Sequence, residues 1–172
     1  MYIAVNMRKK EYLNILKHLF PKRIKRERVS FIFASSIRLN TSLRFNLKEW
    51  YPVKPSEYKF QSSGYVELKD DMRPKIIKKA FDLNASIIEV HSHPYNTPAM
   101  FSYSDLEGFK EFVPHVWWRL KGKPYAALVF SSSDFDGLAW VDSPQDCKPV
   151  TELVVDGNNL QANNLSWSGA SE

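Results

Sequence analysis

Apolar residues in the first half of the chain follow first a helical and then a strand spacing. In residues 8–20, RKKEYLNILKHLF, they recur every three or four positions, and Pro21 ends the pattern. This spacing predicts an N-terminal helix over 8–20. Residues 29–37, VSFIFASSI, form a nearly continuous apolar run that predicts a buried strand, and strand-rich stretches follow at 43–53 and 58–68.

Two further helices are predicted in the second half of the chain. Residues 70–85 place Pro74 in a first turn, and their spacing predicts an apolar inner face made of Ile76, Ile77, Ala80 and Phe81. A shorter helix is predicted from about 104 to 112, ending before Pro114, because proline removes a helical hydrogen bond and clashes with the preceding turn.

The other predicted strands are short apolar runs bounded by turn-forming residues, at 86–91, 125–132, 137–142 and 149–155. The tail 156–172 is polar and rich in Asn and Ser, so it has little to bury and is expected to be loosely held. The order of helices and strands predicts an α/β protein with a mixed central β-sheet flanked by helices, and 172 residues suit one domain, 1–172.

Composition narrows the possible partners and compartments. The single cysteine, Cys147, excludes an internal disulfide and any cysteine-rich metal site. No apolar run reaches membrane-spanning length and residues 1–5 lack a signal-peptide core, so a cytoplasmic protein without a membrane partner is expected. The net charge of +5 fits an acidic partner. The basic run 22–28 contains no aromatic residues, so it is expected to be a solvated connector, and nucleic-acid binding is not expected.

The candidate chemistry lies in His91-Ser92-His93-Pro94 at the end of the predicted strand 86–91. Side chains alternate between the faces of a strand, so the two histidines point the same way, and Pro94 ends the strand beyond them. The following loop leads to Ser102-x-x-Asp105. Two imidazoles and a carboxylate from the next element make three ligands, and a catalytic zinc site has three protein ligands and an open fourth position.

These residues resemble the signature of the JAMM (MPN+) zinc metalloproteases, which include deubiquitinating enzymes. The family also has a glutamate at the start of an upstream strand, and Glu27, at the head of the segment 27–34 (ERVSFIFA), matches that pattern with Ser30 and Ala34 replacing glycines. Eight residues, 94–101, separate the histidines from Ser102 where the family has seven, so one loop residue is expected to bulge outward.

The resemblance implies a JAB/MPN fold, which is related to that of cytidine deaminases. It also implies a role for each residue of the site. His91, His93 and Asp105 would hold Zn²⁺, Glu27 would be the general base, and Ser102 would donate a hydrogen bond to the oxyanion. The implied function is that of a deubiquitinase-like isopeptidase or peptidase that cleaves after the C-terminus of a ubiquitin-like protein. The compact chain most resembles the prokaryotic members of the family, some of which accompany ubiquitin-like conjugation systems. The substrate tail is expected to add to a sheet edge near 41–63.

Simpler interpretations remain open for each residue. Ser102-x-x-Asp105 can be a helix-capping motif, although Ser104-x-x-Glu107 offers a competing capping box that would leave Ser102 free. Glu27 lies among basic residues and can belong to a surface ion pair. At the level of function, the alternatives are a non-catalytic MPN-type binding scaffold and a nucleic-acid-associated JAB-type protein. A nucleoside-deaminase site is excluded, because it needs a pair of cysteines.

Overall fold

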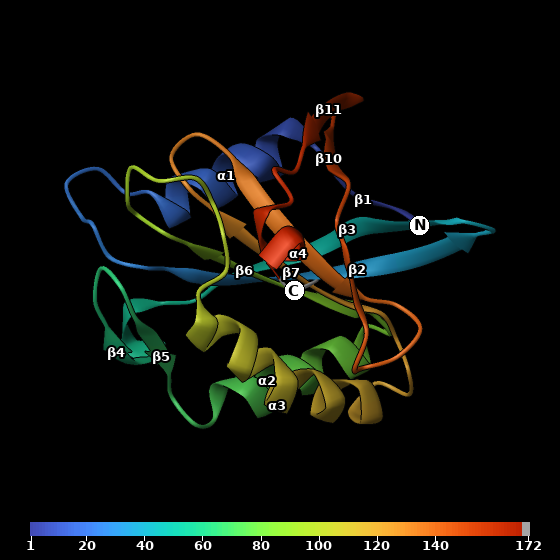
Figure 1. Cartoon of the computed structure of the whole chain (residues 1–172). Coiled ribbons are helices and arrows are strands. Elements are labelled where there is room, and N and C mark those ends of the chain that lie inside the picture. Colours follow the sequence, from blue (N-terminus) through green and yellow to red (C-terminus); the bar gives the residue numbers. More distant parts are fainter. Residues whose placement is uncertain (170–172) are drawn as a thin grey trace.

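A nine-stranded β-sheet runs through the protein in this computed structural model, which describes residues 1–169 (Figure 1). The neighbouring strands are, in order, β11 (Asn158–Gln161), β10 (Glu152–Val155), β1 (Tyr2–Met7), β3 (Ser42–Pro52), β2 (Val29–Leu39), β6 (Ser86–Ser92), β7 (Tyr125–Phe130), β8 (Phe135–Trp140) and β9 (Cys147–Pro149). Strand β1 is parallel to both β3 and β10, and β6 is parallel to β7, whereas the other pairs are antiparallel. The prediction of an α/β protein with a mixed sheet is confirmed.

Helices cover both faces of this sheet. Figure 1 shows α1 (Lys9–Leu19) on one face and α2 (Met72–Asp82) with α3 (Tyr103–Arg119) on the other. Side chains alternate between the two faces of β2, so the strand contributes to both hydrophobic cores. Phe31 and Phe33 pack on the side of α2 and α3, whereas Ile32 packs on the side of α1. The short helix α4 (Leu165–Gly169) lies against β8. None of the helices in the described part of the chain is long and apolar enough to cross a membrane.

The strand-rich segment 58–68 folds into a separate hairpin, β4 (Tyr58–Gln61) with β5 (Val66–Leu68). The expected substrate edge near 41–63 therefore includes parts of strand β3 and of this hairpin. Strand β3 is hydrogen-bonded to β2 along its length, but β1 pairs only with its residues 42–46, so among the described residues no strand pairs with 47–52 on that side. In this part of the chain, an extended segment could be added beside 47–52 of β3 or to the hairpin.

Strand β1 was not anticipated from the sequence. It is the third strand of the sheet and brings the N-terminus between β10 and β3, two segments that are distant in the chain. Its residues Ile3, Ala4 and Val5 are fully buried. A six-residue strand next to a helix has too few alternating positions to stand out by itself, so its partners decide its structure.

The helix predicted at about 104–112 is longer than expected. Helix α3 begins at Tyr103 and continues through Pro114 to Arg119. The helix tolerates one missing hydrogen bond at Pro114 because Phe112, Val113 and Val116 around it are buried in the core. Helix α2 forms as predicted, except that Phe81 is exposed rather than on the inner face.

Candidate metal centre

The histidine pair lies where strand β6 ends, on the face of the sheet that α3 covers. His91 is buried within the strand, and the backbone N–H of His93 donates to the carbonyl of Phe130 at 2.8 Å, which holds it one residue beyond the strand end. The two imidazole ring centroids are 5.1 Å apart. The alternation read from the sequence therefore does place both rings on one side of the strand.

Asp105 reaches the histidines from the first turn of α3. Its Oδ2 atom lies 3.5 Å from Nε2 of His91 and 3.5 Å from Nε2 of His93. Burial alone would raise the pKa of the Asp105 carboxyl. The charge of His91, together with hydrogen bonds from His91, His93 and Ser102, outweighs burial and holds this pKa well below its usual range. Asp105 is therefore a carboxylate directed at both imidazoles.

Ser102 is the N-cap of α3, so the competing box at Ser104 is not the one the helix uses. The Ser102 hydroxyl accepts a hydrogen bond from the Asp105 backbone N–H at 3.2 Å and donates to Asp105 Oδ2 at 2.7 Å. In turn, Oδ2 accepts the Ser102 backbone N–H at 2.8 Å. This reciprocal cap orients the carboxylate of Asp105 while keeping the serine hydroxyl beside the site.

The three ligand-type side chains fit a divalent metal ion. One nitrogen or oxygen from each of His91, His93 and Asp105 lies within 4.8 Å of the others. Nε2 of His91 is buried and makes no hydrogen bond in the described part of the chain. An unpartnered buried nitrogen costs about 1–3 kcal/mol, which a metal bond would offset. Imidazole nitrogens and a carboxylate oxygen form a donor set that suits zinc.

Glu27 joins the histidines through the pairing of β2 with β6. Val29 is opposite His91 in this antiparallel register, and continuing the register places Glu27 opposite His93. The Glu27 Oε1 atom lies 3.8 Å from Nε2 of His93. The backbone N–H of Glu27 donates to Ser62 in the β4–β5 turn at 2.8 Å. Pairing with β6 and with the hairpin thus brings a residue distant in sequence to the candidate metal centre.

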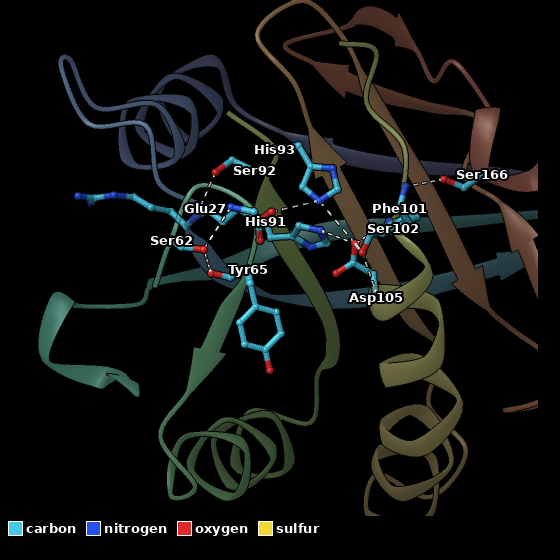
Figure 2. A network of polar contacts seen from close by, with 12 residues as sticks. Glu27, Ser62, Tyr65, His91, Ser92, His93, Phe101, Ser102, Asp105 and Ser166 are labelled. Atoms are coloured by element: carbon cyan, nitrogen blue, oxygen red, sulfur yellow. Dashed lines mark hydrogen bonds and ion pairs between the residues drawn. The ribbon is translucent and has the colours of Figure 1, made fainter. Parts of the chain in front are cut away.

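The carboxyl of Glu27 is shielded from solvent. Only 5% of the residue is exposed, so it is not part of a surface ion pair. Burial raises its pKa above the ordinary value, and the nearby charges of His91 and His93 offset part of that rise. Figure 2 shows Glu27, the two imidazoles and Asp105 converging from separate elements, with Ser102 at their edge.

A hollow of about 200 Å³ opens next to these side chains. Glu27, His91 and Asp105 lie along one part of its lining. Other parts of the lining include Tyr65 and Val66 of the hairpin, Arg73 of α2, and Gly108 and Phe109 of α3. A substrate group could therefore lie between the hairpin and the helices, in contact with the candidate centre.

The C-terminal segment holds the loop between the histidines and Asp105, so the expectation of a loose tail is wrong for its described part. The side-chain amide of Asn163 donates to the Ala99 carbonyl and to Asp134 Oδ2, both at 2.7 Å. The Phe101 backbone N–H donates to the Ser166 hydroxyl at 2.9 Å, as Figure 2 shows. Sequence reasoning missed these supporting residues, and the only local signal was the polar character of the tail. Residues 170–172 of the predicted tail lie outside the described residues.

The five residues singled out from the sequence lie together at one place in the fold: His91, His93, Asp105, Glu27 and Ser102. Comparison of the chain with protein-family models and with curated proteins gives no match. What the structure itself defines is an α/β protein with a candidate site for a divalent ion at the end of a central strand.

Proposed function

We propose that this chain is a zinc-dependent isopeptidase or peptidase with a JAB/MPN-type fold that cleaves after the C-terminus of a ubiquitin-like protein. The observation that carries the proposal is the position of Glu27. A buried carboxyl lies 3.8 Å from one of two imidazoles that already share a carboxylate neighbour. Three metal ligands with a further acid–base group beside them make up the machinery of a hydrolytic zinc site.

A bound zinc ion would supply Lewis acidity and lower the pKa of its water from about 15.7 to about 7. Glu27 accepts a proton from the attacking water as the water oxygen bonds to the carbonyl carbon of the scissile amide. When the C–N bond breaks, Glu27 returns the proton to the leaving amine, so the products are a carboxylic acid group and an amine. The Ser62 carbonyl fixes the backbone of Glu27 for both transfers.

Ser102 serves as the donor to the developing oxyanion. Its hydroxyl points at Asp105 Oδ2 in the resting protein, at 2.7 Å. A rotation about the Cβ–Oγ bond directs the same proton toward a carbonyl oxygen beside the ligands. Removing one such donor costs roughly 10²–10³-fold in kcat in other hydrolases.

Exposed apolar side chains around the site favour a protein substrate. Tyr65, Met100 and Tyr103 have exposed fractions between 47% and 79%. They flank the hollow or the loop leading to Asp105, and apolar groups gathered in this way favour contact with another protein. An extended C-terminal tail can add to the β4–β5 hairpin, which is not paired with the main sheet.

The experiment uses zinc-loaded protein and a linear fusion of a ubiquitin-like domain to a reporter, followed by gel electrophoresis and mass spectrometry. We expect cleavage after the C-terminal glycine of the domain. Glu27→Gln keeps the shape of the side chain and should lower the rate by roughly 10²–10⁴-fold while zinc remains bound. The matched control, Glu111→Gln, changes an exposed glutamate of α3 and should leave the rate unchanged.

Two results would contradict the proposal. Equal cleavage by wild type and Glu27→Gln would remove the assigned base. Stoichiometric zinc binding without cleavage of any ubiquitin-like fusion would indicate a metal-binding scaffold instead. Metal analysis of the same samples separates the second result from a protein that binds no metal.

A further inference from the structure

The connection between α1 and β2 carries an unusual concentration of positive charge. We name residues 22–28 (KRIKRER) the basic ridge. It contains five basic residues and one acid, Glu27, whose carboxyl is turned into the candidate metal centre. The segment from 22 to 26 is exposed throughout. The ridge thus presents its positive charge to solvent and leads directly into the candidate base.

The charge of the ridge is not neutralised within the protein. In residues 1–169, no carboxylate forms an ion pair with any basic residue of the ridge, whereas Lys59, Lys75 and Lys148 elsewhere each pair with an acid. The Nε atom of Arg28 is also buried without an acceptor in this part of the chain. The exposed positive charge of residues 22–26 is therefore available to an acidic partner.

The ridge stands between two hollows. One, of about 590 Å³, lies between the ridge and the loop after the histidines, and Tyr95 lines its far side. The other, of about 460 Å³, lies toward Gln61 of the hairpin. Arg23 and Lys25 line both, and Ile24 between them is 45% exposed. Figure 1 shows the connection and the loop side by side at the edge of the molecule.

We propose that the basic ridge is an exosite for an acidic segment of the protein substrate, in which carboxylates surround an apolar side chain. The identity of the partner as substrate rests on the proposed function. An apolar centre with a charged rim, as Ile24 has here, is the usual anatomy of a contact between proteins. A surface for single-stranded nucleic acid would instead have aromatic rings among the basic residues, on which bases can stack.

The physical basis is charge complementarity next to the reaction site. Arginine guanidinium groups bind carboxylates through paired hydrogen bonds, and Arg23 and Arg26 supply two exposed ones. Because the ridge runs directly into Glu27, an acidic segment held there lies next to the bond to be cut. Attraction of this kind accelerates association and selects among partners more than it adds affinity.

The test is fluorescence anisotropy with the full chain and a short labelled peptide of glutamates around a central leucine. We expect binding that weakens as NaCl rises from about 50 to about 200 mM. The variant with Arg23→Gln, Lys25→Gln and Arg26→Gln should bind roughly tenfold more weakly, because each exposed ion pair contributes about a factor of two. Ile24→Ser should also weaken binding severalfold.

The matched control removes the same charge from α1, through Lys9→Gln, Lys10→Gln and Lys17→Gln, and should bind within about twofold of wild type. Equal losses in the two triple variants would overturn the exosite, because net charge alone would explain the binding. Absence of peptide binding, unchanged binding by Ile24→Ser, or tighter binding of a short oligothymidylate would overturn it as well. The measurement needs no cleavage, so its failure and the failure of the hydrolase proposal are distinguishable.

Discussion

Replacing Asn163 by alanine removes three hydrogen bonds where the C-terminal segment meets the loop of the candidate metal centre. Its amide donates to the Ala99 carbonyl and to Asp134, and its carbonyl oxygen accepts the backbone N–H of Leu165 at 3.1 Å. The bond to a carboxylate contributes about 1.5–3 kcal/mol and the bond to Ala99 about 0.5–1.5 kcal/mol. Leu165 is exposed, so water can replace the third bond. We expect a loss of about 3 kcal/mol.

Urea unfolding of the zinc-free protein measures this loss as a lower midpoint with an unchanged m-value. The same change should weaken zinc binding by about tenfold, because loss of a group that supports metal ligands from behind typically costs 10–100-fold in affinity. A competition titration with a chelator measures the zinc affinity. The control, Asn159→Ala, changes an exposed asparagine of β11 and should alter the free energy of unfolding by less than about 0.5 kcal/mol.

A change in unfolding free energy below about 1 kcal/mol for Asn163→Ala would refute the bond energies assigned above. If the free energy of unfolding falls by the expected amount but the zinc affinity is unchanged, the structural link is refuted. The loop would then hold Asp105 without help from the C-terminal segment.

Three further outcomes follow from single positions. Gly137→Ala should destabilise the fold by about 1–3 kcal/mol in urea unfolding, because a Cβ there would lie 2.7 Å from a Leu128 side-chain carbon. Pro114→Ala should stabilise it by about 2 kcal/mol in the same assay, because a backbone hydrogen bond becomes possible within α3. Burial raises the pKa of Glu57, but hydrogen bonds led by that of Tyr51 outweigh burial and lower the pKa to about 2 from an ordinary 4.5. Its contribution to stability is therefore complete above about pH 4.5 and lost as the pH falls toward 2, and Glu57→Gln should flatten this part of a stability–pH profile.

Short-range pattern was enough for the core of the candidate site. Alternation along a strand requires His91 and His93 to share a face whatever surrounds them, and Pro94 ends the strand at the right place. The helix after the loop begins at Ser102-x-x-Asp105, where the capping box also orients the carboxylate. Two overlapping capping patterns were present in the sequence, and contact of Asp105 with both imidazoles distinguishes the one that is used.

The remaining features of the fold and of the candidate site depend on pairing between distant segments. The position of Glu27 depends on the register of β2 against β6, and the burial of β1 depends on β3 and β10, two strands that are distant from each other in the chain. The tail was expected to be loose because it has few apolar residues, yet Asn163 anchors it through hydrogen bonds to Ala99 in the loop before Asp105 and to Asp134.

The sequence by itself determined the elements and the local pairing of ligand-type side chains, because those depend on neighbours a few residues apart. Only the tertiary structure decided which distant segments meet: Glu27 with the histidines, and the C-terminal segment with the loop before Asp105. Contacts between distant segments form when the free energy gained by packing the whole sheet exceeds the entropic cost of closing long loops. No local stretch of sequence determines that difference.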